Sequence, residues 1–416
     1  MVRRSLAILA IAVLTMSPIP AAAETVSDPV VEWNAIMVST VSGQNPFAQA
    51  RFAAITQLAV FEAVNSITRE YESYLDPIDA PAGASSEAAA AEAAHDVLVT
   101  YFPGAAATLD AALGTSLAAI PDGASKDDGL AVGAAAAAEL IALRTGDGSA
   151  PPAFYLPTST EPGEWQTTPS CPAAGGILFH WQNLRPFGIA SNAQFRSDPP
   201  PRLTSREYTK DYAEVMAVGA SDSTARPADR ADAARLFNAL SAVGAWNAVA
   251  SGLASAHPRS LTAHARAFAL LNLAISDGLA SSIETKYHYR FWRPETAIRA
   301  GDTDGNDWTA GRSDFAPYIA TPCFPGYPSA HASASYAGRW VLERTWEGAD
   351  FSATLSHPAV PGVAIEYTTL KQLTDDIDDA RVYGGIHFRF DQKAGAIQGH
   401  QIANYVLGHV LEGQNE

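Results

Sequence analysis

Helical spacing of small apolar residues is the feature that most constrains how this chain can fold. Between Pro46 and about Ile67, apolar side chains recur three and four residues apart, as they do on one face of an α-helix. Residues 85–119 and 124–145 are rich in alanine, which has the highest helix propensity and lets helices pack closely. No segment shows a sustained alternation of apolar and polar residues, and no repeat of fixed period occurs. The sequence therefore predicts an all-α protein.

The second half of the chain continues this pattern. Its apolar spacing predicts helices over residues 226–255, 261–290, 329–344, 369–381 and 389–412. The tetrapeptide Thr204-Ser205-Arg206-Glu207 has the spacing of a capping box, so it predicts the start of another helix.

Two long segments interrupt the helical bundle. Residues 146–203 are rich in proline, glycine, serine and threonine, which excludes long helices there. The segment also holds Trp165 and Trp181, so we expect a loop that packs over the protein at the mouth of a site. Residues 301–327 form the second predicted loop.

The first 23 residues have the features of a secretory signal peptide. Arg3 and Arg4 precede the apolar run from Leu6 to Met16, and three alanines at 21–23 form a small-residue cleavage site. We therefore expect residues 24–416 to form a single all-α domain of an exported protein, secreted or periplasmic. No later run is both long enough and free enough of charge to predict a membrane span.

The charge and the cysteine content limit which partners the protein can bind and which compartment it can occupy. The 27 Lys and Arg residues against 44 Asp and Glu give a net charge of −17, which argues against a nucleic-acid partner. Any anion site must then be a local basic pocket. Cys171 and Cys323 can form one disulfide in an oxidising compartment, or remain two buried thiols.

A first cluster of basic residues closes the predicted helix over 261–290. Lys286 and Arg293 are seven residues apart, about two helical turns, so they share a face if the helix persists. Pro294 disfavours helical geometry at Arg293 and can turn the chain there. An ammonium and a planar guanidinium suit different oxygens of one tetrahedral oxyanion. The alternative is an ordinary basic helix end.

A second cluster opens the next helix with the sequence Phe324-Pro-Gly-Tyr-Pro-Ser-Ala-His331. Ser329 is placed to cap the helix, which leaves the backbone N–H groups of Ala330 and His331 free to bind an anion. His331 can then act as an acid or a base at this positive helix end. A plain serine cap beside a surface histidine is the alternative.

A third cluster extends from Arg381 to Asp391. Gly384 and Gly385 are expected to break the helix and to let the backbone approach a ligand. Asp391 follows His387 by four residues, a distance that suits a carboxylate accepting the imidazole N–H and raising the basicity of the other ring nitrogen. The alternative is a core histidine satisfied by an aspartate.

Taken together, Lys-x6-Arg-Pro, Pro-Ser-x-His and Arg-x5-His-x3-Asp resemble the signature of the superfamily that joins vanadium-dependent haloperoxidases to type 2 phosphatidic acid phosphatases. The flanks Phe291-Trp-Arg-Pro294 and Gly384-Gly-Ile-His387 are more similar to the haloperoxidase branch. The resemblance implies helical bundles of the haloperoxidase and acid phosphatase type, with the motifs inside residues 226–412. It also implies a vanadate cofactor, in a site that phosphate can occupy as well.

The resemblance implies a role for each motif residue. His387 would be the axial ligand to vanadium, with Asp391 orienting it, and His331 would be the acid–base group. The oxyanion would be held by the side chains of Lys286, Arg293, Ser329 and Arg381 and by the backbone N–H of Ala330. Two positions depart from the family pattern, because Ala330 replaces a glycine and Ala380 replaces a serine. Since neither change removes a charged ligand, we expect tuning of the site and not its loss.

The implied reaction oxidises a halide with hydrogen peroxide to hypohalous acid, which halogenates a small organic acceptor. The metal would remain V(V) and act as a Lewis acid, while His331 and Lys286 handle the protons and charge of the peroxide. Bromide is the expected halide, with chloride left open. Phe324 stands where chloroperoxidases of the family carry phenylalanine, although a packing role explains it more simply.

Two other functions remain open. In an exported acid phosphatase the same pocket would use His387 as the nucleophile and His331 as the acid for the leaving group. A non-catalytic oxyanion-binding protein would bind vanadate or phosphate without turnover. Assays of peroxide-dependent bromination and of phosphate-ester hydrolysis separate the three functions.

Overall fold

The computed structural model describes residues 28–414, and the predicted signal peptide at residues 1–23 lies outside the described residues. Helices make up most of this part of the chain. Its only strands are β1 (Ala353–Ser356) and β2 (Ala364–Tyr367), which pair antiparallel as a hairpin too short to show alternation in the sequence. The prediction of an all-α protein is therefore confirmed.

The helices fall into two groups along the chain. The first comprises α1 (Pro29–Val41), α2 (Pro46–Thr68), α3 (Ser86–Tyr101), η1 (Pro103–Ala105), α4 (Ala106–Ala118) and α5 (Ala124–Leu143). A long segment containing only the turn η2 (Phe179–Asn183) leads to the second group. This comprises α6 (Arg206–Val218), α7 (Ala228–Ala239), α8 (Ala242–Ala256), α9 (Leu261–Tyr289), α10 (Pro294–Arg299), η3 (Gly301–Thr303), α11 (Ala330–Thr345), α12 (Leu370–Tyr383) and α13 (Arg389–Leu407).

Short polar side chains fix where several helices begin. Ser260 and Ser329 cap α9 and α11 by accepting a backbone N–H three residues ahead. The predicted capping box at 204–207 is wrong by one residue, because Ser205 and not Thr204 caps α6. The continuous helix predicted over 226–255 is also wrong. Ser241 caps a new helix inside that apolar pattern, so α7 and α8 are separate.

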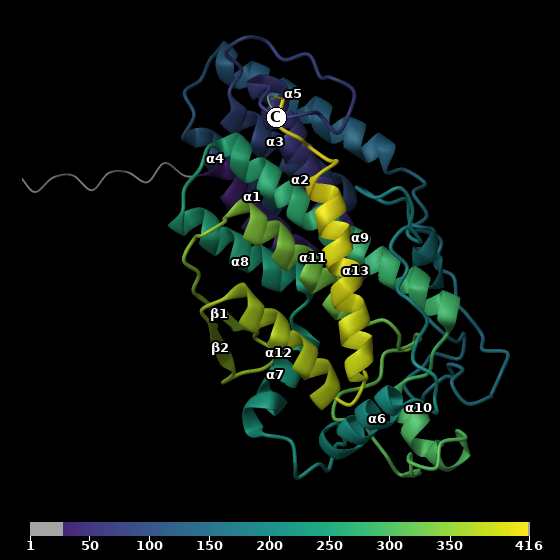
Figure 1. Ribbon diagram of the computed structural model, residues 1–416. Coiled ribbons are helices and arrows are strands. Elements are labelled where there is room, and N and C mark those ends of the chain that lie inside the picture. Colours follow the sequence, from purple (N-terminus) through teal and green to yellow (C-terminus); the bar gives the residue numbers. More distant parts are fainter. Residues whose placement is uncertain (1–27, 415–416) are drawn as a thin grey trace, which may run out of the picture.

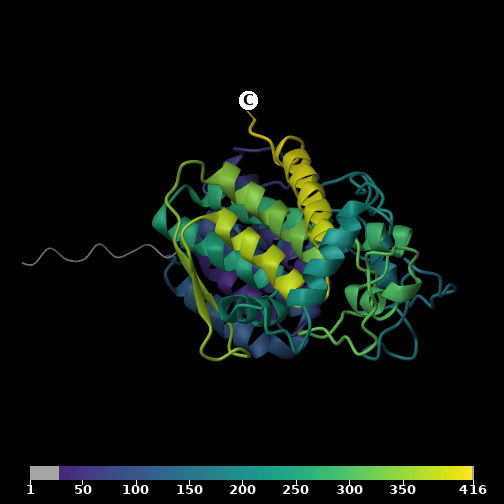
Figure 2. The same cartoon turned by 60° about the horizontal axis from the view of Figure 1, so that its bottom comes forward.

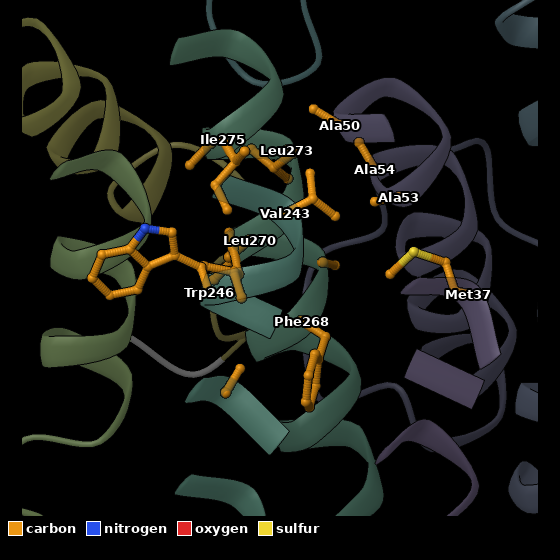
Figure 3. Packing of buried hydrophobic residues seen from close by; sticks show 14 of the residues in the cluster. Met37, Ala50, Ala53, Ala54, Val243, Trp246, Phe268, Leu270, Leu273 and Ile275 are labelled. Carbon is orange, nitrogen blue, oxygen red and sulfur yellow. The ribbon is translucent and has the colours of Figure 1, made fainter. Parts of the chain in front are cut away.

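Helix α9 forms the centre of the molecule. It lies beside α11 and α13 (Figure 1), and its side chains are buried over almost its whole length. Figure 3 shows the small side chains of Ala50, Ala53 and Ala54 on α2 facing larger ones on α9, such as Leu273. Small residues on one helix therefore make room for large ones on its neighbour.

Within residues 28–414 no single helix is long and apolar enough to cross a membrane, although the bent pair of Ser86–Tyr101 and Pro103–Ala118 meets the test by length and composition.

The two long loops, residues 146–203 and 301–327, gather on one flank of the helices, near α6 and α10 (Figures 1 and 2). The first loop packs against the end of α9, since the backbone N–H of Trp165 donates to Arg290 O and the backbone N–H of Trp292 donates to Gly163 O. A disulfide joins Cys171 in this loop to Cys323 in the second, with 5.1 Å between the Cα atoms. Of the two states considered for the cysteines, a disulfide or two buried thiols, the structure therefore contains the disulfide.

Glycines on α13 allow this helix to approach α11 closely. A Cβ atom at Gly399 would lie 2.1 Å from the carbonyl oxygen of Ser333, well inside van der Waals contact. Gly399→Ala is therefore expected to destabilise the protein by about 1–3 kcal/mol in chemical denaturation. Gly252→Ala on α8 is the matched control, because its Cβ meets nothing within 4 Å. The helix-propensity gain there should raise stability by about 0.5–1 kcal/mol, and equal effects of the two variants would contradict the packing argument.

Glu62 on α2 is a buried carboxyl whose titration should affect stability. Its Oε1 accepts the N–H of Tyr74 at 2.5 Å, while Oε2 has no partner, and burial raises its pKa from 4.5 to about 7. A carboxyl whose pKa is raised in the folded state favours folding most below its unfolded pKa. This contribution is lost as the pH rises from 4.5 through about 7.

Glu62→Gln should remove that dependence, because the amide keeps an acceptor for Tyr74 without acquiring charge. The loss of stability between pH 4.5 and 8 should shrink by about 3 kcal/mol in the variant, as measured by urea denaturation across this range. Glu347→Gln, at an exposed position, serves as the control and should show the same dependence of the free energy of unfolding on pH as the wild type. An unchanged slope in Glu62→Gln would contradict the predicted titration.

Candidate active site

The three sequence clusters meet at one buried place. Lys286 comes from the last turn of α9, and Arg293 is the N-cap of α10. Ser329 is the N-cap of α11, Arg381 lies in the last turn of α12, and Asp391 lies in the first turn of α13. These side chains and that of His387 are between 0% and 3% exposed. The structure therefore brings all the predicted motifs together, from helix ends that are far apart in the sequence.

Lys286 holds the loop that leads into α11. Its Nζ donates to Pro325 O at 3.0 Å, to Gly326 O at 2.7 Å and to Pro328 O. Three carbonyl acceptors match the three N–H donors of an ammonium. Burial, and then the neighbouring Arg293, hold the pKa of Lys286 well below its ordinary value. In this arrangement Lys286 shapes the backbone of the second motif and adds positive charge to the pocket.

Arg293 reaches the site by a turn of the chain. Helix α9 ends at Tyr289, where Arg290 adopts a left-handed conformation, so the continuous helix face considered for Lys286 and Arg293 does not form. Arg293 Nε donates to Phe324 O at 2.9 Å, and Nη1 contacts Ile386 O at 2.9 Å and His387 Nε2 at 2.8 Å. Its buried Nη2 has no partner. Burial lowers the pKa of Arg293 to about 9, which leaves the group cationic at neutral pH.

His387 is held between Arg293 and a carboxylate. Its Nδ1 lies 2.8 Å from Asp391 Oδ2, which also accepts the N–H of Phe388 at 3.0 Å. Because Nδ1 faces a carboxylate and Nε2 faces Arg293, the neutral ring carries its proton on Nδ1 and directs the lone pair of Nε2 toward the cation. Burial and the nearby cations hold the pKa of His387 well below its ordinary value. Burial raises the pKa of Asp391 to about 7, against the opposing effect of Lys286.

The start of α11 supplies backbone donors. Ser329 Oγ accepts Ala332 N–H at 3.3 Å, and Ser329 N–H donates to Asp391 O at 2.9 Å, which ties the second motif to the third. The first-turn N–H groups, those of Ala330 and His331, have no acceptor within the helix. His331 is less buried than the other motif residues, and burial followed by Arg381, Lys286 and Arg293 holds its pKa well below the ordinary value. It is therefore a neutral base at physiological pH.

Arg381 completes the cationic pocket. Its Nη1 donates to Phe237 O at 3.1 Å, its buried Nε has no partner, and burial lowers its pKa to about 10. The glycines that follow it end α12, as expected, because the helix stops at Tyr383. A Cβ atom at Gly385, where φ is +79°, would lie 2.2 Å from Gly219 O. The backbone at Gly385 thus approaches the end of α6 closely.

The pocket contains more positive than negative charge. Lys286, Arg293 and Arg381 are its cations, and Asp391 is the carboxylate among the motif residues. Buried charge without a counter-ion is costly, and two guanidinium nitrogens of the site remain unpaired, while Nε2 of His387 contacts only a cationic donor, Arg293 Nη1. This donor set fits a tetrahedral oxyanion such as vanadate or phosphate. The first group of helices contributes no charged side chain to these contacts.

Two supporting residues were missed by the sequence reasoning. Asp211 on α6 is buried and accepts the N–H of Phe390 at 2.8 Å, so it holds the start of α13 next to Asp391. The carbonyl of Phe237 on α7 positions Arg381. An aspartate inside an amphipathic helix and a backbone carbonyl carry no local signal, because their role depends on which helices pack together.

The fold is shared with proteins of known structure. A bacterial vanadium-dependent iodoperoxidase superposes with a TM-score of 0.74 at 23% identity, over 94% of this chain and 97% of that one. A holo-type bacterial vanadium-dependent chloroperoxidase superposes with a TM-score of 0.71 at 17% identity, over 89% of this chain and 94% of that one. No curated protein sequence matches the chain.

The fold is thus that of the vanadium-dependent haloperoxidases, as the three motifs predicted. Within it, residues 266–416 match the family of the VCPO second helical-bundle domain, and this match contains all three motifs.

Proposed function

We propose that this protein is an exported vanadate-dependent haloperoxidase that oxidises a halide with hydrogen peroxide to hypohalous acid. The observation that carries the proposal is the pair of unpaired guanidinium nitrogens, Arg293 Nη2 and Arg381 Nε, in the same buried site as a histidine held by Asp391. The fold shared with a vanadium-dependent iodoperoxidase and chloroperoxidase supports it.

Each residue has a role that follows from its contacts. His387 Nε2 would ligate vanadium, because Asp391 holds the proton on Nδ1. Arg293, Arg381, Ser329 and the N–H of Ala330 would bind the oxyanion, and Lys286 would set the loop beside it and contribute charge. Bound vanadate supplies Lewis acidity. His331, kept neutral by burial and then by its cationic neighbours, would accept the proton that hydrogen peroxide must lose before it can act as a nucleophile.

The proposed location is outside the cytoplasm, in the secreted fraction or the periplasm. The disulfide between Cys171 and Cys323 supports this proposal, since disulfides persist in oxidising compartments. Fractionation of producing cells, followed by mass determination of the mature chain, tests both export and cleavage after residue 23.

The test of function compares two reactions in purified protein, with and without orthovanadate. Peroxide- and bromide-dependent bromination of a phenolic dye that appears only with vanadate is the expected result. Chloride and iodide in place of bromide then define the halide range. Hydrolysis of a phosphate ester that vanadate inhibits, without bromination, would overturn the proposal and indicate a phosphatase. Tight vanadate binding without either reaction would indicate a non-catalytic binding protein.

A further inference from the structure

A cavity of about 440 Å³ lies outside the candidate site, and no residue of the three motifs lines it. Its walls come from the start of α2, from residues 149–154 and from residues 177–181. Sites for small molecules have volumes from about 300 Å³ upwards, so this cavity has the size for a molecule of one or two rings.

Two packed aromatic rings, Phe47 and Phe324, lie between the wall of the cavity and the candidate active site. Trp181 in its wall contacts Phe47, with 5.9 Å between ring centroids, and Phe47 contacts Phe324 at 6.3 Å. Phe324 in turn lies against the motif cations, 5.0 Å from Arg293 Cζ and 5.5 Å from Lys286 Nζ. The backbone connects them as well, because the N–H of Ile177 in the cavity wall donates to Cys323 O at 2.9 Å.

The lining favours an uncharged aromatic ligand. Phe52, Phe154 and Trp181 offer ring surfaces, and the side chain of Phe154 is 48% exposed. The one guanidinium in the wall, Arg51, is neutralised by Asp147 at 2.7 Å. His180 accepts the N–H of Ala153 at 3.1 Å, and burial lowers its pKa, which keeps the ring neutral. Apolar walls with a few neutral polar groups are typical of sites for small organic molecules.

We propose that this cavity binds the organic acceptor, an uncharged electron-rich aromatic molecule, two aromatic side chains away from the residues where hypohalous acid is formed. This inference rests on the proposed haloperoxidase function. In the reaction, a ring carbon of the acceptor attacks the halogen of hypohalous acid, so that a carbon–halogen bond forms and the halogen–oxygen bond breaks. The ring then loses its proton, which combines with the departing hydroxide to give water.

The binding experiment uses 2-naphthol as the probe and vanadate-loaded protein without peroxide, with calorimetry as the readout. Ala153→Trp fills the cavity from a loop position and is expected to weaken binding by at least about tenfold. Phe154→Ser removes one exposed ring and should weaken it severalfold while leaving the fold intact. Trp308→Ser is the matched control, since Trp308 is 82% exposed and lies outside the cavity. Equal affinity in wild type and both cavity variants would overturn the proposal.

A competition experiment separates this inference from the proposed function. With peroxide and bromide, 2-naphthol competes with phenol red, a charged acceptor, and the product ratio is compared with that given by hypobromite reagent. The wild-type protein should give a higher ratio of brominated 2-naphthol to brominated phenol red than the hypobromite reagent gives. In Ala153→Trp this ratio should fall to the value given by the reagent, while the total amount of bromination stays unchanged. A wild-type ratio equal to the reagent's would overturn the acceptor site. Probe binding that depends on the cavity, without bromination of either acceptor, would support the cavity and contradict the haloperoxidase function.

Discussion

Replacing His387 with alanine is expected to lower vanadate-dependent bromination more than about 100-fold, the largest effect of any single change in the site. The imidazole is the one neutral nitrogen donor of the third motif, and under the proposed function its loss removes a direct ligand of vanadium. Loss of a group that only orients a metal ligand costs about 10- to 100-fold, so Asp391→Asn should fall in that range. The measurement is initial bromination rate at saturating vanadate, together with vanadate affinity by calorimetry.

The control for this prediction is His288→Ala, two residues after Lys286 on an exposed position of α9. It should retain wild-type rate and affinity. Full bromination by His387→Ala would exclude His387 as the vanadium ligand, while a comparable loss in His288→Ala would point to a general structural effect.

Arg381→Met is expected to have opposite effects on stability and on anion binding. Arg381 is buried without a contacting carboxylate, so removing its charge should raise the free energy of unfolding of anion-free protein by at least about 1 kcal/mol. The same change should weaken vanadate and phosphate binding by about 10- to 100-fold, the value of one hydrogen bond to a charged group. In wild type, vanadate at 100 times its Kd should stabilise the protein by about 2.7 kcal/mol.

Thermal denaturation with and without vanadate measures both effects. Arg230→Met is the matched control, because Arg230 on α7 pairs with Asp376 at 2.6 Å and Asp379 at 3.2 Å on α12 and is not a motif residue. Loss of the Arg230 side chain should lower the stability of the protein slightly and leave unchanged the rise in melting temperature that vanadate produces. A fall in stability of anion-free Arg381→Met, with vanadate affinity retained, would contradict the view that the pocket holds unbalanced positive charge.

The sequence predicted the parts of this fold that depend on local rules. Helix α9 spans almost the range expected from its apolar spacing, and Ser329 caps α11 as its place after a proline indicated. Local rules also produced the errors. Ser241 starts a helix within an unbroken apolar pattern, and Ser205 competes with Thr204 for one cap, so spacing alone does not distinguish these outcomes.

The candidate site likewise has features that the sequence predicts and contacts that it does not predict. The residue types and their spacing predicted which side chains would gather, because each motif is only a few residues long. The contacts between motifs depend on packing between helices. The three carbonyls around Lys286, the carbonyl of Phe237 on Arg381 and the approach of Gly385 to Gly219 are of this kind. Such contacts pair residues across tens to more than a hundred positions, which a reading of short motifs does not reach.

The disulfide also determines how the protein would respond to a protease. Cys171 and Cys323 are 152 positions apart, and the bond between them encloses α6 to α10 together with most of the loop 301–327. A single cut anywhere inside that span leaves both fragments joined through the sulfur atoms. Phe324, next to Cys323, would therefore keep its covalent anchor to the loop beside the cavity even in nicked protein. In the exported haloperoxidase that we propose, such tolerance of a broken backbone would extend the working life of the protein.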